Sequence, residues 1–448
     1  MAEIFFDLSK TAGELKVFNA VNNGPTGESV RLSGNDSNFD SYKALKIPYA
    51  RTHDASFSTA FGGEFSVDVH RIFRDFNADE NDEASYIFEP TDRYLSNMVK
   101  AGTEPFYRLG ASIEHNYKFG TYPPADFEKW ARICEHIIMH YNEGWNNGYH
   151  MNIQYWEIWN EPDCMNADGS NPCWQGTEDE FVQFYVTASS YLKKKFPNLQ
   201  IGGPAFCTLS SENFVRKFLS EVKSKNAPLD FFSYHCYSRT TESFAKDIRK
   251  GRELLDEYGF SDTKTILNEW NYVKGWSGEL WDYSIRAERG VKGASFVAAI
   301  ASLAQKLSLD MLMYYDARPC RMNGLFDQVT LQPLKSYYIF EILRDIAEEK
   351  TALSFEVTGS ENIYALGAKK DGHSELMITH YNDCDETVPE EVSIRVKNPD
   401  GKVKVEYYLT DEENNNKHIR DEIFTAEEFS IYLTMELFTT YNIKITKI

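Results

Sequence analysis

The feature that most restricts the fold of this chain is a regular alternation of short β-rich runs with amphipathic helical patterns. Apolar residues at three- and four-residue spacing predict helices, for example over 127–141, 178–196 and 295–307. Strands that alternate with helices form parallel sheets, and eight of them fit a closed (β/α)8 TIM barrel better than an open doubly wound sheet. The predicted strands are 43–51, 65–73, 104–110, 152–160, 199–205, 229–237, 264–270 and 310–317.

The pattern changes after about residue 345. From there to the C-terminus the chain consists of short alternating segments broken by turn signals such as KDG and NPDG, which predicts an antiparallel β-sandwich. The polar stretch 411–418 is predicted to be a hairpin loop, and the N-terminal segment EIFFDLSK is expected to add a strand to the sandwich. The expected division is a catalytic barrel over 16–345 and an accessory sandwich built from 1–15 and 346–448.

Charge and composition exclude several classes of function. A net charge of −21 argues against nucleic-acid binding, because phosphates are bound mainly by Lys and Arg. No run approaches the roughly 18 apolar residues of a membrane span, so we expect no membrane partner. The N-terminus lacks the pattern of a signal peptide, which makes a cytoplasmic location the expectation, unless a leader was trimmed.

Metal and disulfide chemistry are not expected either. Seven cysteines without regular spacing argue against a disulfide framework, although Cys164 and Cys173 flank a loop and could pair under oxidation. No HExxH or paired CxxC spacing occurs, which argues against zinc. No Gly-rich phosphate loop follows the early strands, so no metal and no other cofactor is predicted.

Two carboxylates stand at the ends of predicted strands. Glu161 follows the fourth strand and Glu269 ends the seventh. Barrel enzymes keep their chemistry at this end of the strands, and hydrolysis of a glycoside needs one carboxylic acid to protonate the leaving oxygen and one carboxylate to attack or to activate water. A salt-bridged residue at the barrel rim is the alternative for either glutamate alone. Both together, each beside a Trp and an Asn, predict a catalytic pair.

Other strand ends carry polar residues that fit such a site. Arg51 is the candidate that holds a nucleophilic carboxylate ionised, and His53 follows it. His235 and Tyr237 share one face of a period-two strand, whereas Cys236 points to the other face and is interpreted as packing. A structural role, or a place in a metal-ligand set, is the alternative for the two histidines.

These motifs carry a resemblance. The segments WEIWNEPD, IGGPA, DFFSYHCY and ILNEW, with Arg51 and His53 after the first predicted strand, resemble clan A of the glycoside hydrolases, and most closely family 39, the family of β-xylosidases and α-L-iduronidases. The resemblance covers about residues 40–345 and implies that Glu161 is the acid/base, Glu269 the nucleophile and Asn160 the donor to the sugar 2-hydroxyl. Trp270, beside Glu269, is expected to line the mouth.

The segment after the eighth strand departs from the family pattern. It reads YYDARPCRMNG (314–324), with Asp316 retained but Arg318, Pro319 and Cys320 where β-xylosidases usually have paired glutamates. Arg318 and Arg321 could face a carboxylate or a sulfate of the substrate, or a salt bridge with Asp316 could hold Arg318. A second departure is Asp54 after His53, where the family usually has Gly.

The resemblance therefore predicts a retaining exo-acting glycosidase, β-xylosidase-like, whose partner is an oligosaccharide or glycoside. An α-L-arabinofuranosidase and a uronic-acid-directed glycosidase are the alternatives within the family. A catalytically silent carbohydrate-binding protein is the alternative of another class, and homo-oligomerisation stays open.

Overall fold

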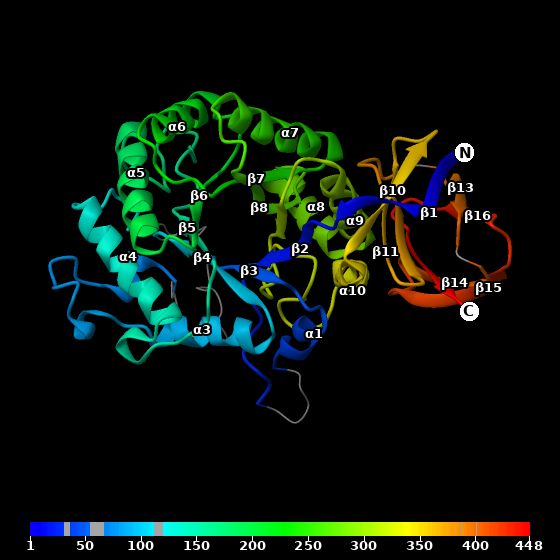
Figure 1. The fold of residues 1–448 in the computed structure, drawn as a ribbon, viewed down its shortest axis with the longest axis horizontal. Helices are drawn as coiled ribbons and strands as arrows, with labels where there is room; N and C mark the ends of the chain where they lie inside the picture. Colours follow the sequence, from blue (N-terminus) through cyan, green and yellow to red (C-terminus); the bar gives the residue numbers. More distant parts are fainter. Residues whose placement is uncertain (31–35, 54–66, 112–119, 387, 400) are drawn as a thin grey trace.

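The computed structural model describes residues 1–30, 36–53, 67–111, 120–386, 388–399 and 401–448. Asp54 and the first two residues of the predicted strand 65–73 lie outside these ranges. A barrel surrounded by helices and a separate sheet lie side by side, and both chain termini lie in the sheet (Figure 1). None of the helices in the described ranges is long and apolar enough to cross a membrane.

Eight parallel strands close the barrel, as predicted. Two of the predicted assignments change. The first barrel strand, β2, had been missed because it is a short run, VFNAVN, next to the long N-terminal strand. The predicted strand 65–73 is wrong: Val69, Ile72 and Phe73 are buried at helical spacing around a short helix. In chain order the barrel strands are β2 (Val17–Asn22), β3 (Tyr49–Arg51), β4 (Glu104–Leu109), β5 (Tyr155–Ile158), β6 (Gln200–Phe206), β7 (Phe231–Ser238), β8 (Lys264–Tyr272) and β9 (Met311–Tyr314).

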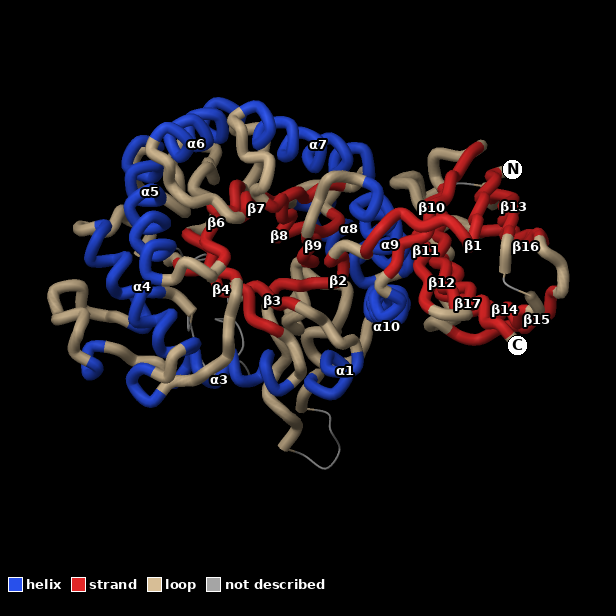
Figure 2. Tube along the Cα trace, in the orientation of Figure 1, coloured by secondary structure: helices blue, strands red, loops and turns tan. Residues whose placement is uncertain are grey.

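Helices surround the barrel on its outside (Figure 2). The three helices predicted from apolar spacing are present as α4, α5 and α9, and α9 begins a few residues earlier than expected. The helical elements are α1 (Phe39–Ala44), α2 (Val69–Ile72), η2 (Glu83–Ser85), α3 (Glu89–Lys100), α4 (Phe127–Asn142), η3 (Trp145–Asn147), α5 (Glu178–Lys195), α6 (Glu212–Ser224), α7 (Thr241–Glu257), α8 (Gly278–Arg289), α9 (Val291–Lys306) and α10 (Lys335–Glu349).

The second unit is a nine-stranded sheet in the order β15-β14-β17-β12-β11-β10-β1-β13-β16, antiparallel except for the pair β1–β13. Its end strands β15 and β16 approach each other, since Phe424 stacks on Phe429 at 4.0 Å between ring centroids. The sheet therefore folds over one shared core, as the predicted sandwich does. The strands are β1 (Ala2–Glu14), β10 (Thr351–Thr358), β11 (Ile363–Lys370), β12 (His373–His380), β13 (Glu390–Lys397), β14 (Val403–Thr410), β15 (Lys417–Phe424), β16 (Glu428–Met435) and β17 (Thr440–Lys447).

The N-terminal strand β1 lies between β10 and β13, which agrees with the expectation that this segment joins the sandwich. The polar stretch after β14 connects the antiparallel pair β14–β15, so it is the predicted hairpin loop. The division of the chain at residues 16 and 345 stays a prediction.

Side chains inside the barrel form layers. A cluster of apolar residues fills the barrel near the amino ends of its strands, including Tyr155 of β5, Phe231 of β7 and Ile266 of β8. Two residues further along these strands are Glu157, Ser233 and Asn268, which are completely buried and hydrogen-bonded to one another through Glu157. The residues that follow on these strands lie at the mouth of the barrel. In β8 a register shift against β7, after the pair Tyr234 and Leu267, interrupts the alternation, so that both Asn268 and Glu269 point inward.

Candidate active site

A cavity of about 580 Å³ opens at the carboxyl ends of the barrel strands. It is lined by residues from β3, β5, β7 and β8 and the segments that follow them, including His53, Asn160, Glu161, His235, Tyr237, Glu269 and Trp276. The sequence predicted six of these seven residues as site residues, and the structure brings them together. Trp276, which is 60% exposed, was missed.

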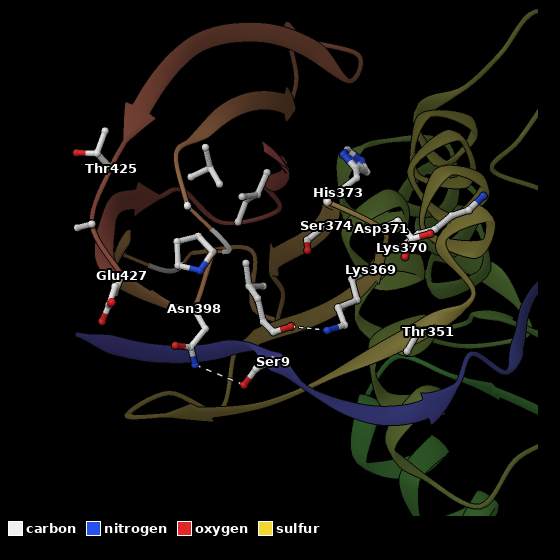
Figure 3. A pocket seen from close by; sticks show the side chains of 17 residues that line it. Ser9, Thr351, Lys369, Lys370, Asp371, His373, Ser374, Asn398, Thr425 and Glu427 are labelled. Carbon is white, nitrogen blue, oxygen red and sulfur yellow. Dashed lines mark hydrogen bonds between the residues drawn. The ribbon is translucent and has the colours of Figure 1, made fainter. Parts of the chain in front are cut away.

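A second cavity, of about 730 Å³, lies in the nine-stranded sheet (Figure 3). Its lining includes Lys369, His373, Asn398 and two acidic residues, Asp371 and Glu427, which lie on opposite sides of it. This arrangement offers no pair of carboxylates that could act on one bond. The smaller cavity in the barrel therefore holds the candidate chemistry.

Glu269 is held by donors on both carboxylate oxygens. Arg51 Nη1 and His53 Nε2 each lie 2.7 Å from Oε1, and the Tyr237 hydroxyl donates to Oε2 at 2.9 Å. Burial would raise the pKa of Glu269, but the positive charges of His235, His53 and Arg51 and the hydrogen bond from His53 outweigh burial and hold it well below its ordinary value. Glu269 is thus an ionised carboxylate in a nearly closed environment.

Arg51 organises the layer beneath the cavity. Its side chain is completely buried and donates to Glu157 at 2.6 Å, to Asn22 at 3.2 Å and to the Asn160 side-chain oxygen at 2.6 Å, besides Glu269. Since the oxygen of Asn160 is engaged by Arg51, the amide group is the end of that side chain that can donate to a ligand. Arg51 stands on the second barrel strand, not the first, because β2 precedes it.

The backbone around Glu161 is strained. Trp159 and Glu161 have positive φ angles of 77° and 49°, a region that costs non-glycine residues of order 1–3 kcal/mol each. Backbone hydrogen bonds from Trp159 to Leu109 and from Glu161 to Ala205 hold this turn. The strand β6 approaches closely at Gly203, where a Cβ atom would lie 2.8 Å from the carbonyl oxygen of Ile158, so the GGPA motif permits the contact.

Glu161 and Glu269 face each other across His235. His235 Nδ1 lies 2.9 Å from Glu161 Oε1, and its Nε2 lies 3.5 Å from Glu269 Oε1. One oxygen of each carboxylate lies within 4.8 Å of the other. The side chain of Glu161 is 19% exposed, whereas that of Glu269 is 5% exposed. The pair therefore consists of one carboxyl open to the cavity and one enclosed carboxylate.

Three predicted site residues lie elsewhere. Trp270 is 1% exposed and packs outside the barrel against Phe244, Phe296 and Tyr314, because neighbours on a strand point to opposite faces and Glu269 points inward. Asp316 and Arg318 are buried and pair with each other at 3.4 Å, and neither is among the described residues that line the cavity.

The two arginines after β9 therefore have protein partners. Arg321 is 59% exposed and pairs with Asp282 at 2.7 Å, and Arg318 pairs with Asp316. These contacts agree with the rim salt bridge that the sequence left open, rather than with recognition of a charged substrate.

Sequence reasoning missed the buried support of the site, above all Glu157 and Asn22. Glu157 accepts hydrogen bonds from Arg51, Ser233 and Asn268. A signal was available: Glu157 is a carboxylate within β5, four residues before Glu161, at a position where a period-two strand points into the barrel. Asn22 was missed together with β2.

Two groups in the cavity have the composition of metal ligands. Glu161, His235 and Glu269 form one, and Glu161, Cys164 and Cys173 form the other, each with its ligand atoms within 4.8 Å of one another. In the first group Glu269 is already paired with the guanidinium of Arg51 at 2.7 Å, so the group offers little to a cation.

Comparisons with known proteins find relatives of the chain. The sequence profile described as "Glycosyl hydrolases family 39" matches residues 62–420. A curated protein named "Beta-xylosidase" from Geobacillus stearothermophilus is 28% identical over 188 residues, which are 39% of this chain and 35% of that protein. The chain thus matches only about a third of the length of this curated relative.

Solved structures share the fold over the whole chain. A glucosidase from Croceicoccus marinus has a TM-score of 0.81 at 20% identity and covers 100% of this chain and 99% of its own. A monomeric β-xylosidase from Caulobacter crescentus CB15 has a TM-score of 0.72 at 15% identity, with the same coverage. At these identities the likeness shows the architecture alone.

Proposed function

Since the matching profile spans most of its length, the chain belongs to glycosyl hydrolase family 39, and we propose that it is a retaining glycoside hydrolase that removes a terminal sugar from an oligosaccharide or glycoside. The observation that carries the proposal is the facing pair Glu161 and Glu269, whose carboxylate oxygens come within 4.8 Å while their environments differ. Retaining enzymes hold their carboxyl groups about 5–5.5 Å apart, and inverting enzymes about 6.5–9.5 Å apart.

Glu269 is the nucleophile in this proposal. Its low pKa, which Arg51 and the two histidines maintain against burial, keeps it ionised and able to attack the anomeric carbon. Tyr237, whose pKa is raised well above its ordinary value by burial and by the charge of Glu269, stays protonated and orients the carboxylate by its hydrogen bond. The bond formed is a glycosyl ester and the bond broken is that to the leaving oxygen.

Glu161 is the acid/base. It protonates the leaving oxygen and then accepts a proton from the water that hydrolyses the ester. His235 positions its carboxyl through Oε1. Asn160 donates its amide to the sugar 2-hydroxyl, because its oxygen is held by Arg51. The name of the curated relative supports a β-xyloside as the first substrate to test.

The nucleophile is tested by Glu269→Gln. This isosteric change should lower kcat/KM by about 10⁴-fold or more, the scale on which loss of a covalent nucleophile falls in other enzymes. The exposed Glu279→Gln on α8 is the matched control and should keep wild-type activity. Substantial turnover by Glu269→Gln, with the fold intact by circular dichroism, would contradict the role.

The acid/base is tested by Glu161→Ala. Turnover of glycosides with poor leaving groups should fall by about 10²–10⁴-fold, whereas activated nitrophenyl glycosides should lose much less at the first step. Azide should then restore the second step and give a glycosyl azide of retained configuration. Equal losses on both classes of substrate would count against Glu161.

The substrate and the stereochemistry need two further measurements. A panel of nitrophenyl pentosides, hexosides and uronides identifies the sugar, with β-xyloside expected to give the highest kcat/KM. Proton NMR of the first-formed sugar should show the anomer of the substrate. An inverted product would make Glu269 a general base, and inactivity on the whole panel would favour a carbohydrate-binding role.

A further inference from the structure

Three cysteines lie near Glu161, and one of them, Cys173, faces the carboxylate oxygen that His235 does not contact. Cys164 and Cys173 lie in the segment between β5 and α5, and Cys207 directly follows β6. The sulfur atoms of Cys164 and Cys173 and one oxygen of Glu161 lie within 4.8 Å of one another, and Cys207 is hydrogen-bonded to Cys164. None of the seven cysteines, all of which fall in the described ranges, forms a disulfide.

The protein holds this cluster in place through backbone contacts. The Asn171 side chain donates to the carbonyl of Pro162 at 2.6 Å and accepts from the amides of Cys173 and Trp174, both at 2.9 Å. Asp163 accepts from the amide of Cys207 at 2.7 Å. Hydrogen bonds thus link the two segments that carry the thiols to the turn that carries Glu161. The backbone therefore holds the cysteines near Glu161 before any ligand binds.

The two oxygens of Glu161 have different surroundings. Oε1 receives the hydrogen bond of His235, and Oε2 faces the Cys173 sulfur at 3.9 Å. A ligand at the cysteines can therefore take Oε2 while His235 continues to hold Oε1. Cys164, Cys207 and Glu161 line the cavity, which gives such a ligand a path from solvent.

We propose that Cys164, Cys173 and Glu161 bind one thiophilic divalent cation, of the Zn²⁺ and Cd²⁺ type. Thiolates select such ions over Mg²⁺ or Ca²⁺. Tetrahedral zinc has Zn–S bonds of about 2.3 Å and Zn–O bonds of about 2.0–2.2 Å, which place the ligand atoms roughly 3.5–3.8 Å apart. From separations of up to 4.8 Å, the ligand atoms reach this spacing by approaching one another by at most about 1.3 Å. Cys207 or a water molecule supplies the fourth ligand.

Binding replaces two S–H bonds by two metal–sulfur bonds and releases their two protons to solvent, and where Glu161 carries the acid proton, that proton is released as well. No oxidation state changes. The bound ion also takes the carboxylate of Glu161, which then has no proton to give to a leaving group. In the proposed function, on which this consequence rests, the cation is a reversible inhibitor that acts on the acid/base and leaves Glu269 untouched.

Cadmium is the probe, because cadmium thiolates absorb in the near ultraviolet. Reduced, metal-free protein titrated with Cd²⁺ should show this charge-transfer band saturating at one ion per chain. Cys164→Ser and Cys173→Ser should each weaken the binding by more than about 100-fold, beyond the 10–100-fold cost of losing an outer partner of a metal ligand. Cys384→Ser, at an exposed cysteine, is the matched control and should bind like wild type.

The activity measurement is separate. The ratio of activities with and without saturating Cd²⁺ should be far below one for wild type and Cys384→Ser, close to one for the two cluster variants, and restored by EDTA. Absence of the band in wild type, or an unchanged band in both cluster variants, would refute the site. Saturation without inhibition would refute its link to Glu161. Inactivation reversed by dithiothreitol but not by EDTA would mean a disulfide instead of a metal site.

Because the absorption titration needs no turnover, it still tests the site if the chain proves inactive on every glycoside. Failure of the metal site and failure of the proposed function are therefore distinguishable.

Discussion

Single residues at the barrel mouth act through their charges more than through their packing. Arg51 lies between two buried carboxylates, Glu157 and Glu269, and each of them would be costly without it, since removing one member of a buried ion pair destabilises by about 3–5 kcal/mol. His53 adds a second donor to the same oxygen of Glu269. The consequence at this scale is that the carboxylate of Glu269 stays ionised in acid.

His53→Asn should move the acidic limb of the profile of kcat/KM against pH upward. The positive charge and hydrogen bond of His53 lower the pKa of Glu269, so their loss raises it, and the carboxylate is protonated at a higher pH than before. Wild-type activity on an activated nitrophenyl glycoside should persist well below pH 4.5, the ordinary pKa of Glu. His150→Asn, at an exposed histidine, should leave the profile unchanged. An unshifted limb in His53→Asn would show that His53 does not tune Glu269.

Elements hold the loops that carry the chemistry, and α5 is the clearest case. Its first turn closes a capping box, in which Thr177 accepts from the Glu180 amide at 3.2 Å and Glu180 accepts from the Thr177 amide at 2.8 Å. Thr177→Ala should lower the free energy of unfolding by about 1 kcal/mol. Thr187→Ala, the same change within this helix, should be neutral or slightly stabilising, because Ala is the better helix former. Urea denaturation measures both, and equal losses would contradict a capping role.

At the scale of the whole molecule, charged and hydrogen-bonded side chains join the barrel to the nine-stranded sheet. Lys292 of α9 is buried in this contact, where it donates to Tyr283 and Asp385 at 2.8 Å and pairs with Asp383 at 3.1 Å. Tyr272, at the end of β8, donates to Asp383 at 2.6 Å. The segment that follows β12 thus reaches the barrel near the strand that carries Glu269.

Lys292→Met should destabilise the protein by about 2 kcal/mol, since Asp383 and Asp385 would lose the buried ammonium that joins them, although Arg239 and Lys274 still pair with Asp383. Thermal unfolding should then separate into two transitions, one for each unit. Lys404→Met removes partly exposed ion pairs with Glu406 and Asp421 on β14 and β15 and should cost less than about 1 kcal/mol. A single transition at the wild-type temperature in Lys292→Met would show that other contacts join the units.

The sequence alone determined the periodic features of this protein. Alternation of apolar runs with helical spacing predicted the closed barrel, and alternation at period two predicted the sheet after residue 345, because both patterns follow from which side chains must be buried. It also determined the family, through motifs such as WNEPD and GGPA. These motifs stand at the ends of strands, where packing alone does not explain polar side chains and positive φ angles. The sequence did not predict the short strand β2 or the short helix α2 (Val69–Ile72), because elements of so few residues carry too little periodic signal.

Only the tertiary structure decided which side chains meet. Glu157 lies 106 residues from its partner Arg51, and Glu269 lies 218 residues from the same side chain, so their shared network exists only once the barrel closes. Closure also places the side chain of Trp270 outside the barrel and that of Glu269 inside it, although the two residues are neighbours in the chain. It further brings Cys207, after β6, next to Cys164 in the loop after β5. The physical reason is that strand register and barrel curvature, which depend on all eight strands together, set the distances on which charge and hydrogen bonding act.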